Sequence, residues 1–214
     1  MRRLSHLLMS PACRLVRLAL GEKRVACDLK APDDPLAHVP DFTEISGERA
    51  IGLWAIIDHI ENEHPEPPLV PADPRERAEA LRLIDWIMTK FHDEATRRIV
   101  FEKCAQAHTG HLTRDPPDMA TVRAGRVALR NALAVLGPLA EARGFLACRD
   151  VTLADLATAA HLSAIDYYGE VPWAEYPSIA EWYGKMKSRP SFRSLLADRV
   201  PGQPPVLHYA ELDF

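Results

Sequence analysis

Long apolar runs are missing from this sequence of 214 residues. None comes near the roughly 18 consecutive apolar residues that a membrane-spanning helix needs, so we expect a protein that does not insert into a bilayer. The N-terminus carries Arg2 and Arg3, but no long apolar segment and no cleavage site of small residues follows them. A signal peptide is therefore not predicted, and we expect a cytoplasmic protein.

Cysteine is also scarce. The four cysteines, at positions 13, 27, 104 and 148, lie far apart, and no C-x-x-C pair occurs. This spacing is typical of reduced thiols in a cytosol and argues against a metal site built from cysteines. We expect neither a bound metal nor a cofactor.

Neither sign of charge dominates the chain. Its 26 basic and 30 acidic side chains give a formal net charge of −4, which argues against a general nucleic-acid binder. A hydrophobic content of 47% and a charged content of 26% are ordinary for a globular protein. The length allows one large domain or two small ones, each with a real core.

Eighteen prolines stand against ten glycines, and the prolines mark the breaks between elements. Five of them fall within residues 65–74 and predict a stiff linker. Before it, Ser10 is placed to cap a helix that begins at Pro11 and ends near Gly21. An alternating pattern predicts a strand over 24–29, and a second helix is expected over 48–63.

After the linker the pattern becomes helical. Long helices are predicted over 75–108 and 118–142, and shorter ones over 178–187 and 191–197. The last stretch, 198–214, is not helical by pattern. The chain therefore divides into an α/β domain (1–64), the linker (65–74), an all-helical domain (75–197) and an extended tail (198–214).

A helix start is strongly marked at Thr152. Thr152 and Asp155 stand three residues apart before an apolar run, which is the spacing of a capping box. Val151 precedes the cap and Leu156 is the fourth helical residue, as in a hydrophobic staple. We therefore predict a well-capped, Ala-rich helix that neighbouring elements can approach closely.

Three motifs resemble the glutathione S-transferase architecture: Ser10-Pro11-Ala12-Cys13-Arg14-Leu15-Val16-Arg17, Val39-Pro40 and Thr152-Leu153-Ala154-Asp155. The resemblance implies a thioredoxin-like N-terminal domain followed by a helical bundle. It also implies a cis peptide bond before Pro40. The interval between Pro40 and Ile45 is shorter than this fold's β-hairpin requires, so we expect either a truncated hairpin or missing loop residues.

Further motifs resemble one group within that superfamily, the FtsZ-localised protein A family of alphaproteobacteria. They are Arg75–Ala78, Leu83–Trp86, Val122–Arg126, Lys187–Arg193, Leu195–Gly202 and His208–Phe214. This resemblance implies a homodimer that binds FtsZ at midcell and bends or bundles its filaments without catalysis. It also implies a C-terminal tail that contacts the division protein FtsK.

The alternative is a glutathione-dependent transferase or isomerase in which Ser10 activates the thiol. A hydroxyl at a helix N-terminus suits a thiolate, although the simpler interpretation of Ser10, which we favour, is a helix cap. Transferases usually have Glu-Ser where this chain has Gly47-Glu48, so the contacts that grip glutathione are weakened. Cys13 is expected to be a buried apolar residue rather than a redox nucleophile.

Arg123, Arg126 and Arg130 follow helical spacing and share one face. This is either a solvated face or a docking surface for an acidic partner such as FtsZ, extended by Arg97 and Arg98 with Glu102 nearby. The tail offers a second partner site, and on the strength of the resemblance we favour a partner over packing against the body. Its residues are His208, Tyr209, Glu211, Leu212, Asp213 and Phe214.

Overall fold

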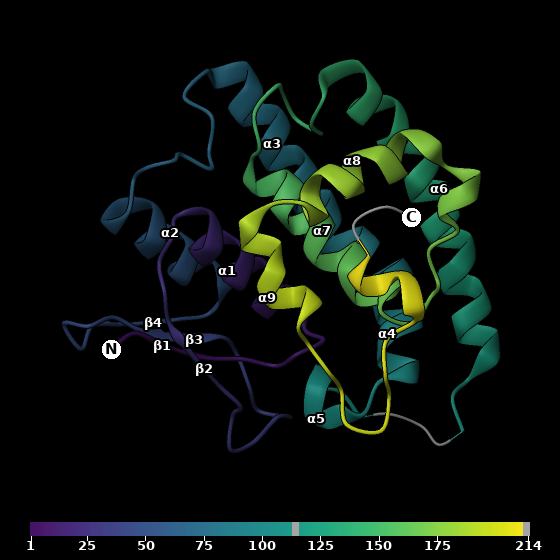
Figure 1. The fold of residues 1–214 in the computed structure, drawn as a ribbon, viewed down its shortest axis with the longest axis horizontal. Helices are drawn as coiled ribbons and strands as arrows, with labels where there is room; N and C mark the ends of the chain where they lie inside the picture. The colour runs from purple at the N-terminus through teal and green to yellow at the C-terminus, as the bar shows by residue number, and fades with distance from the viewer. Residues whose placement is uncertain (113–115, 212–214) are drawn as a thin grey trace.

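The computed structural model describes residues 1–112 and 116–211. Its N-terminal part holds a mixed sheet of four short strands in the order β2-β1-β3-β4 (Figure 1). The first strand pairs in parallel with β2 and antiparallel with β3, which in turn pairs with β4. The strands are β1 (Arg3–Ser5), β2 (Asp28–Lys30), β3 (Asp41–Thr43) and β4 (Arg49–Ile51).

Helices α1 (Pro11–Glu22) and α2 (Leu53–Glu63) pack on the same face of this sheet. Leu4 and Phe42 of the sheet form a small core with Val16 of α1 and Ile56 of α2. Ser10 caps α1, and Pro11 is its first residue, as predicted. The expected strand over 24–29 instead begins at Asp28, because the chain first turns at Arg24 (φ 56°) and buries Val25.

Between Pro40 and α2 the structure has the truncated hairpin, one of the two expected alternatives, and a later helix start than predicted. Residues 44–48 form a turn between β3 and β4, closed by the Glu44 amide, which donates to the Glu48 carbonyl at 2.8 Å. The hairpin is therefore present, with strands of three residues each. The helix expected from Glu48 begins only at Leu53, since Gly52 has a φ of 91° that a helix does not allow.

The prediction of a cis peptide bond before Pro40 is wrong. In the described residues, the cis peptide bond precedes Pro67 instead. Pro40 is buried, and its carbonyl accepts from the Gly52 amide at 2.8 Å. The chain is thus held at the entry to β3 by the hairpin that follows.

The remainder of the described chain is helical. The long helix predicted over 75–108 ends at Lys103, where the backbone turns extended at Cys104, and its middle third is π-helical. The helices are α3 (Pro74–Trp86), η1 (Ile87–Thr96), α4 (Arg97–Lys103), α5 (Gln106–Thr109), α6 (Met119–Arg143), α7 (Leu153–Asp166), α8 (Pro177–Lys187) and α9 (Arg193–Leu196). Single 3₁₀ turns are η2 (Trp173–Glu175), η3 (Pro190–Phe192) and η4 (Leu207–Ala210).

Helix α7 lies at the centre of the molecule (Figure 1), and every one of its residues is buried. The predicted capping box is present: the Thr152 hydroxyl accepts from the Ala154 amide, and the Asp155 carboxylate accepts from the Thr152 amide at 2.9 Å. Alanines on α7 allow α1, α3 and η1 to pack closely around it.

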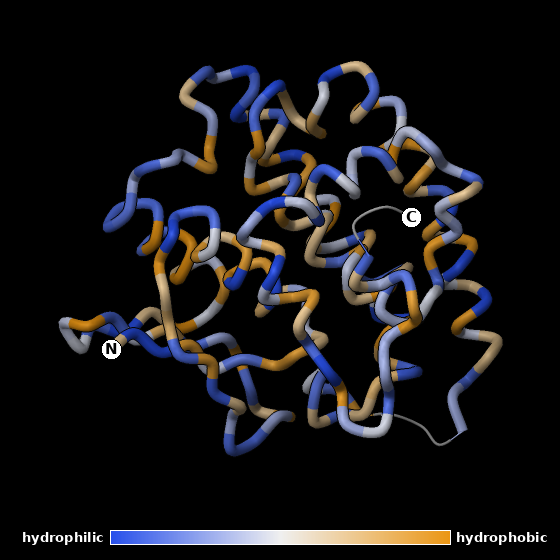
Figure 2. Tube along the Cα trace, in the orientation of Figure 1, coloured by the Kyte–Doolittle hydropathy of each residue, from blue (hydrophilic) through white to orange (hydrophobic). Residues whose placement is uncertain are grey.

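The larger of two apolar clusters surrounds α7 and joins all the long helices. Figure 2 shows these apolar segments inside the helical part, with polar segments outside. Over residues 1–112 and 116–211, no helix combines the length and apolar character needed to cross a membrane.

Candidate functional site

Ser10 serves as a helix cap. Its hydroxyl accepts from the Cys13 amide at 3.5 Å. Cys13 is fully buried; its sulfur accepts from the Leu7 amide at 3.3 Å and lies 3.8 Å from Nε2 of His38. Burial raises the pKa of the Cys13 thiol above its usual value, so this thiol is a poor source of thiolate.

The pair that stands in place of the Glu-Ser of transferases is not at a helix terminus. Gly47 and Glu48 lie in the exposed β3–β4 turn, and Gly47 has a φ of 92°. Helix α2 instead starts with Gly52 and Leu53, without any side-chain cap. Within the described residues, the first amides of this helix therefore receive no hydrogen bond from a capping side chain.

The arginine face on α6 is partly engaged within the protein. Arg126 makes a two-pronged ion pair with Glu170, with Nη2 2.7 Å from Oε1. Arg130 makes a similar pair with Glu175, with Nη2 2.9 Å from Oε1. Arg123 is exposed, and within the described residues it has no ion pair. The three arginines do share a helix, and within the described residues Arg123 is the member of the three that has no ion pair.

Glu170 is the most enclosed member of this group, with a side chain only 7% exposed. Burial by itself would raise the pKa of its carboxyl, but hydrogen bonds from Arg126 and Lys103 outweigh burial and lower the pKa. Glu170 is therefore an ionised clamp at neutral pH that joins α4, α6 and the segment after α7.

Glu102 also has an internal role. Its carboxylate accepts from the Asp118 amide at 3.0 Å, just before α6. It lines a cavity of about 690 Å³ together with Arg97 and Arg98. Phe101 also lines this cavity, and its ring is stacked on that of His111 with the ring centroids 4.2 Å apart.

The tail packs against the body, contrary to the expectation of an exposed aromatic anchor at Tyr209. Tyr209 is fully buried, and its hydroxyl donates to the Leu195 carbonyl at 3.0 Å. Nε2 of His208 lies 3.2 Å from Oδ1 of Asp166. Glu211 is exposed. The remaining predicted tail residues, Leu212, Asp213 and Phe214, lie outside the described residues.

The polar contacts behind the tail were not predicted. Arg14 and Arg17, both buried in α1, donate to the carboxylate of Asp198 at 2.9–3.1 Å. The only signal in the sequence is the presence of two arginines within an apolar helix, which indicates buried partners but does not identify them.

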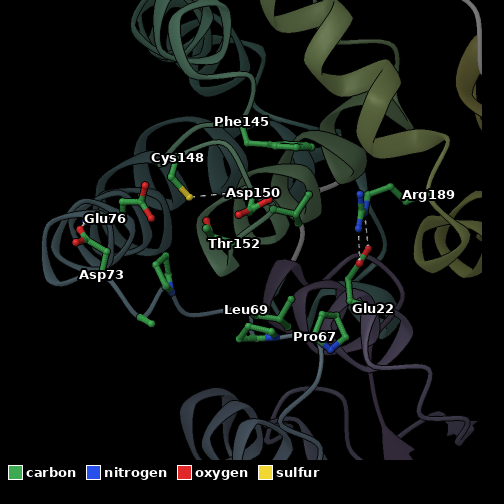
Figure 3. Close-up of a pocket in the computed structure, with 14 residues that line it drawn as sticks. Glu22, Pro67, Leu69, Asp73, Glu76, Phe145, Cys148, Asp150, Thr152 and Arg189 are labelled. Carbon is green, nitrogen blue, oxygen red and sulfur yellow. Dashed lines mark hydrogen bonds and ion pairs between the residues drawn. The ribbon is translucent and has the colours of Figure 1, made fainter.

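A further cavity of about 570 Å³ lies between the proline linker and the segment before α7 (Figure 3). Proline rings and Phe145 form part of its wall, and the Glu22–Arg189 ion pair lies at one side, 2.6 Å between Oε2 and Nη2. Cys148 in this wall donates to the Asp150 carbonyl at 3.5 Å, and burial raises the pKa of its thiol. Across the described residues, no group of three or more His, Cys, Asp or Glu could hold a metal.

No family model matches this sequence. FtsZ-localized protein A of Caulobacter vibrioides is 43% identical over 227 aligned positions, which span 100% of this chain and 98% of that protein. The chain belongs to the FtsZ-localized protein A family. The predicted family is thereby confirmed.

Solved structures agree with this membership. FzlA from C. crescentus superposes with a TM-score of 0.89 at 40% identity, covering 100% of this chain and 99% of that one. A glutathione S-transferase from Rhodospirillum rubrum superposes with a TM-score of 0.92 at 38% identity, covering both chains completely. The fold is therefore that of the glutathione S-transferases, as predicted.

Proposed function

We propose that this chain is a non-catalytic cell-division protein that binds FtsZ filaments. The observation that carries the proposal is the full-length similarity to FtsZ-localized protein A. The site around Ser10 supports it, because the serine caps α1, Cys13 is buried, and α2 begins at Gly52 without a polar side chain. Such a site has little with which to bind or activate a thiol.

The proposed mechanism is bivalent. A homodimer has two identical FtsZ-binding faces related by its twofold axis. Once one face is bound, the second meets its filament at a high effective concentration. Neighbouring filaments are then held at a set angle, and the filaments are bent or bundled without chemistry. We place this activity in the cytoplasm at midcell.

Arg123 is the best-placed residue of the docking face for an acidic partner. It is exposed and, within the part of the chain described, has no ion pair. Arg97 and Arg98 are also exposed and line the neighbouring cavity. Arginines present flat, two-pronged donors that suit the carboxylates of FtsZ.

Co-sedimentation with GTP-polymerised FtsZ, with and without glutathione, tests the proposal. We expect the protein to pellet with filaments regardless of glutathione. Arg123→Glu should reduce pelleting, whereas Arg149→Glu, a like change at an exposed arginine after α6, should not. Absence of the unmodified protein from the pellet at micromolar concentration would exclude FtsZ binding.

The tail supplies a proposed second contact, with FtsK. Tyr209 is buried and Glu211 is exposed, so we assign the contact to Glu211 and to the residues that follow it in the sequence, Leu212, Asp213 and Phe214. Asp213→Lys should therefore preserve FtsZ pelleting and weaken FtsK capture by the immobilised protein. Loss of both interactions would show that the tail end supports the whole molecule instead.

A glutathione-dependent enzyme is the second candidate, favoured by the complete superposition on the Rhodospirillum rubrum transferase. Glutathione-affinity resin separates the two functions. An enzyme that uses Ser10 would be retained and eluted by free glutathione, and Ser10→Ala would abolish turnover. We expect the protein to flow through.

A further inference from the structure

One segment of the chain contacts both proposed partner sites. It runs from the end of α7 to η2, residues 166–175, and we call it the acidic loop because it carries Asp166, Glu170 and Glu175. The first of these carboxylates contacts the tail, and the other two contact the arginine face. One short segment thus carries ion pairs to both surfaces.

The tail lies directly on the acidic loop. The Val206 amide donates to the Tyr167 carbonyl at 3.1 Å, and Nε2 of His208 lies 3.2 Å from Asp166. Gly169 (φ 68°) comes so close to Val206 that a Cβ there would stand 2.7 Å from Cγ1. The tail therefore covers the loop at several consecutive residues.

Two additional hydrogen bonds fix the loop's position. The Tyr167 hydroxyl donates to the Gln203 carbonyl at 2.8 Å, and the side chain of Gln203 donates to the Lys103 carbonyl at 2.7 Å. Lys103 is also a partner of Glu170. The tail is thus linked to Glu170 in two ways. It contacts the loop that carries Glu170, and through Gln203 it contacts Lys103 of α4, which pairs with Glu170.

On its other side, the loop occupies two of the three arginines of the docking face. Glu170 holds Arg126 and Glu175 holds Arg130, each through two hydrogen bonds. An acidic partner that uses these arginines has to displace the internal carboxylates. Glu175 is 54% exposed and can move away by itself, but Glu170 is only 7% exposed and can leave only if the loop moves.

We propose that the acidic loop couples the tail to the arginine face, so that release of the tail from the loop makes Arg126 and Arg130 available to an acidic partner. The proposal rests on the proposed function, since it describes the regulation of the same FtsZ-binding face. While the tail is packed on the acidic loop, Glu170 and Glu175 stay paired with Arg126 and Arg130 and compete with the partner for these arginines. By linkage, an acidic partner bound to these arginines also weakens the seating of the tail.

His208→Ala tests the coupling by removing the side chain that contacts Asp166. Tyr209→Phe is a second variant, which removes the hydroxyl contacts but keeps the buried ring. Glu211→Gln is the matched control, because Glu211 is an exposed residue of the same tail, two positions after Tyr209. Circular dichroism and thermal melting establish which variants are folded.

Two readouts do not involve FtsZ. Hydrogen exchange of peptides covering residues 167–176 should become faster in His208→Ala and in Tyr209→Phe, and remain unchanged in Glu211→Gln. The Nε–H signal of Arg126 in ¹⁵N spectra, which reports its bond to Glu170, should broaden or disappear in the same two variants. Unchanged exchange and an intact Arg126 signal in a folded variant would overturn the coupling.

The third readout is FtsZ affinity. With the tail released we expect co-sedimentation to strengthen by about fivefold, within the usual range of coupling between sites. If the loop opens but FtsZ affinity stays the same, the coupling to partner binding is wrong while the proposed function stands. If the unmodified protein does not pellet at all, the proposed function fails, and the first two readouts still decide whether tail and loop are coupled.

Discussion

The guanidinium of Arg14 and the hydroxyl of Tyr209 lie 3.1 Å apart, with both side chains fully buried, although 195 positions separate them in the sequence. The same guanidinium donates to the Leu8 carbonyl, to Ser163 of α7 and to Asp198. One buried cation thus joins the first helix, the central helix and the tail.

Replacement of Arg14 by methionine should destabilise the protein strongly. Methionine is apolar and similar in length, but it leaves Asp198 with Arg17 as its remaining guanidinium partner and leaves Tyr209 without its donor. Removal of one partner from a buried ion pair costs about 3 to 5 kcal/mol. Urea unfolding followed by circular dichroism measures this loss.

Arg149→Met is the control for that experiment. Arg149 is exposed, so the same substitution there should change the free energy of unfolding by less than about 0.5 kcal/mol. Equal stability of the Arg14→Met protein and the unmodified protein would show that the buried arginine is replaceable by apolar packing.

Two glycines in α6 should respond in opposite directions to alanine. A Cβ at Gly125 would lie 2.8 Å from Cγ1 of Ile99 and 2.9 Å from Cβ of Arg98, whereas at Gly137 nothing lies closer than 3.8 Å. We expect Gly125→Ala to lose about 1 to 3 kcal/mol through overpacking. Gly137→Ala should gain up to about 1 kcal/mol from helix propensity.

Thermal melts of the two variants side by side provide the measurement. Because the substitution is identical and both sites lie in one helix, the difference between the variants isolates the packing between α6 and the η1–α4 segment. A gain in both would mean that this packing has room for a methyl group.

Stability should decrease below neutral pH, partly because of His6. Burial first, and then the positive charge of Arg17, lower the pKa of His6 to about 4, against an ordinary value of 6.5. Between these two values the unfolded chain binds the proton and the folded chain does not, so stability falls as the pH falls through this window. Between pH 7 and pH 5, His6 should lower the free energy of unfolding by about 2 kcal/mol.

His6→Gln should therefore flatten the dependence of the unfolding free energy on pH between 7 and 5. His161, fully buried with a pKa far below its usual value, continues to contribute a slope of the same sign in the variant. Urea titrations at pH 7, 6 and 5 provide the comparison. An identical slope in both proteins would show that the fold leaves the pKa of His6 at its ordinary value.

Much of the helical part was predictable because its signals are local. The cap at Thr152–Asp155, the helix beginning at Pro11, and the long apolar periods of α3 and α6 depend only on neighbouring residues. For the opposite reason, the sequence left open whether the β3–β4 hairpin is truncated or lacks loop residues. Its strands have three residues each, too few for an alternating pattern, and they are specified by pairing with β1.

The candidate site was predicted less completely, since the identities of partners depend on tertiary packing. The spacing of Arg123, Arg126 and Arg130 placed them on one helix, but nothing near them in sequence indicates Glu170 or Glu175. Tyr209 looks like an exposed terminal aromatic in the sequence, and only the fold brings it to Arg14.

Asp155 should be the most sensitive carboxylate in the molecule. Fully buried, it accepts four hydrogen bonds at 2.8 to 3.0 Å: from the amides of Leu146 and Thr152, the Thr152 hydroxyl and Nε1 of Trp182. Asp155→Ala leaves these buried donors without an acceptor, and each unpaired donor costs about 1 to 3 kcal/mol. We therefore expect a loss of stability that leaves little folded protein at 37 °C.

Thr152→Ala is the comparison, because loss of a capping side chain alone costs about 1 kcal/mol. Urea unfolding of both variants at 25 °C, with the Trp182 fluorescence change as the probe, separates the two effects. Equal losses for the two variants would show that Asp155 acts only as part of the helix cap, and that its bonds to Leu146 and Trp182 contribute nothing to the core around α7.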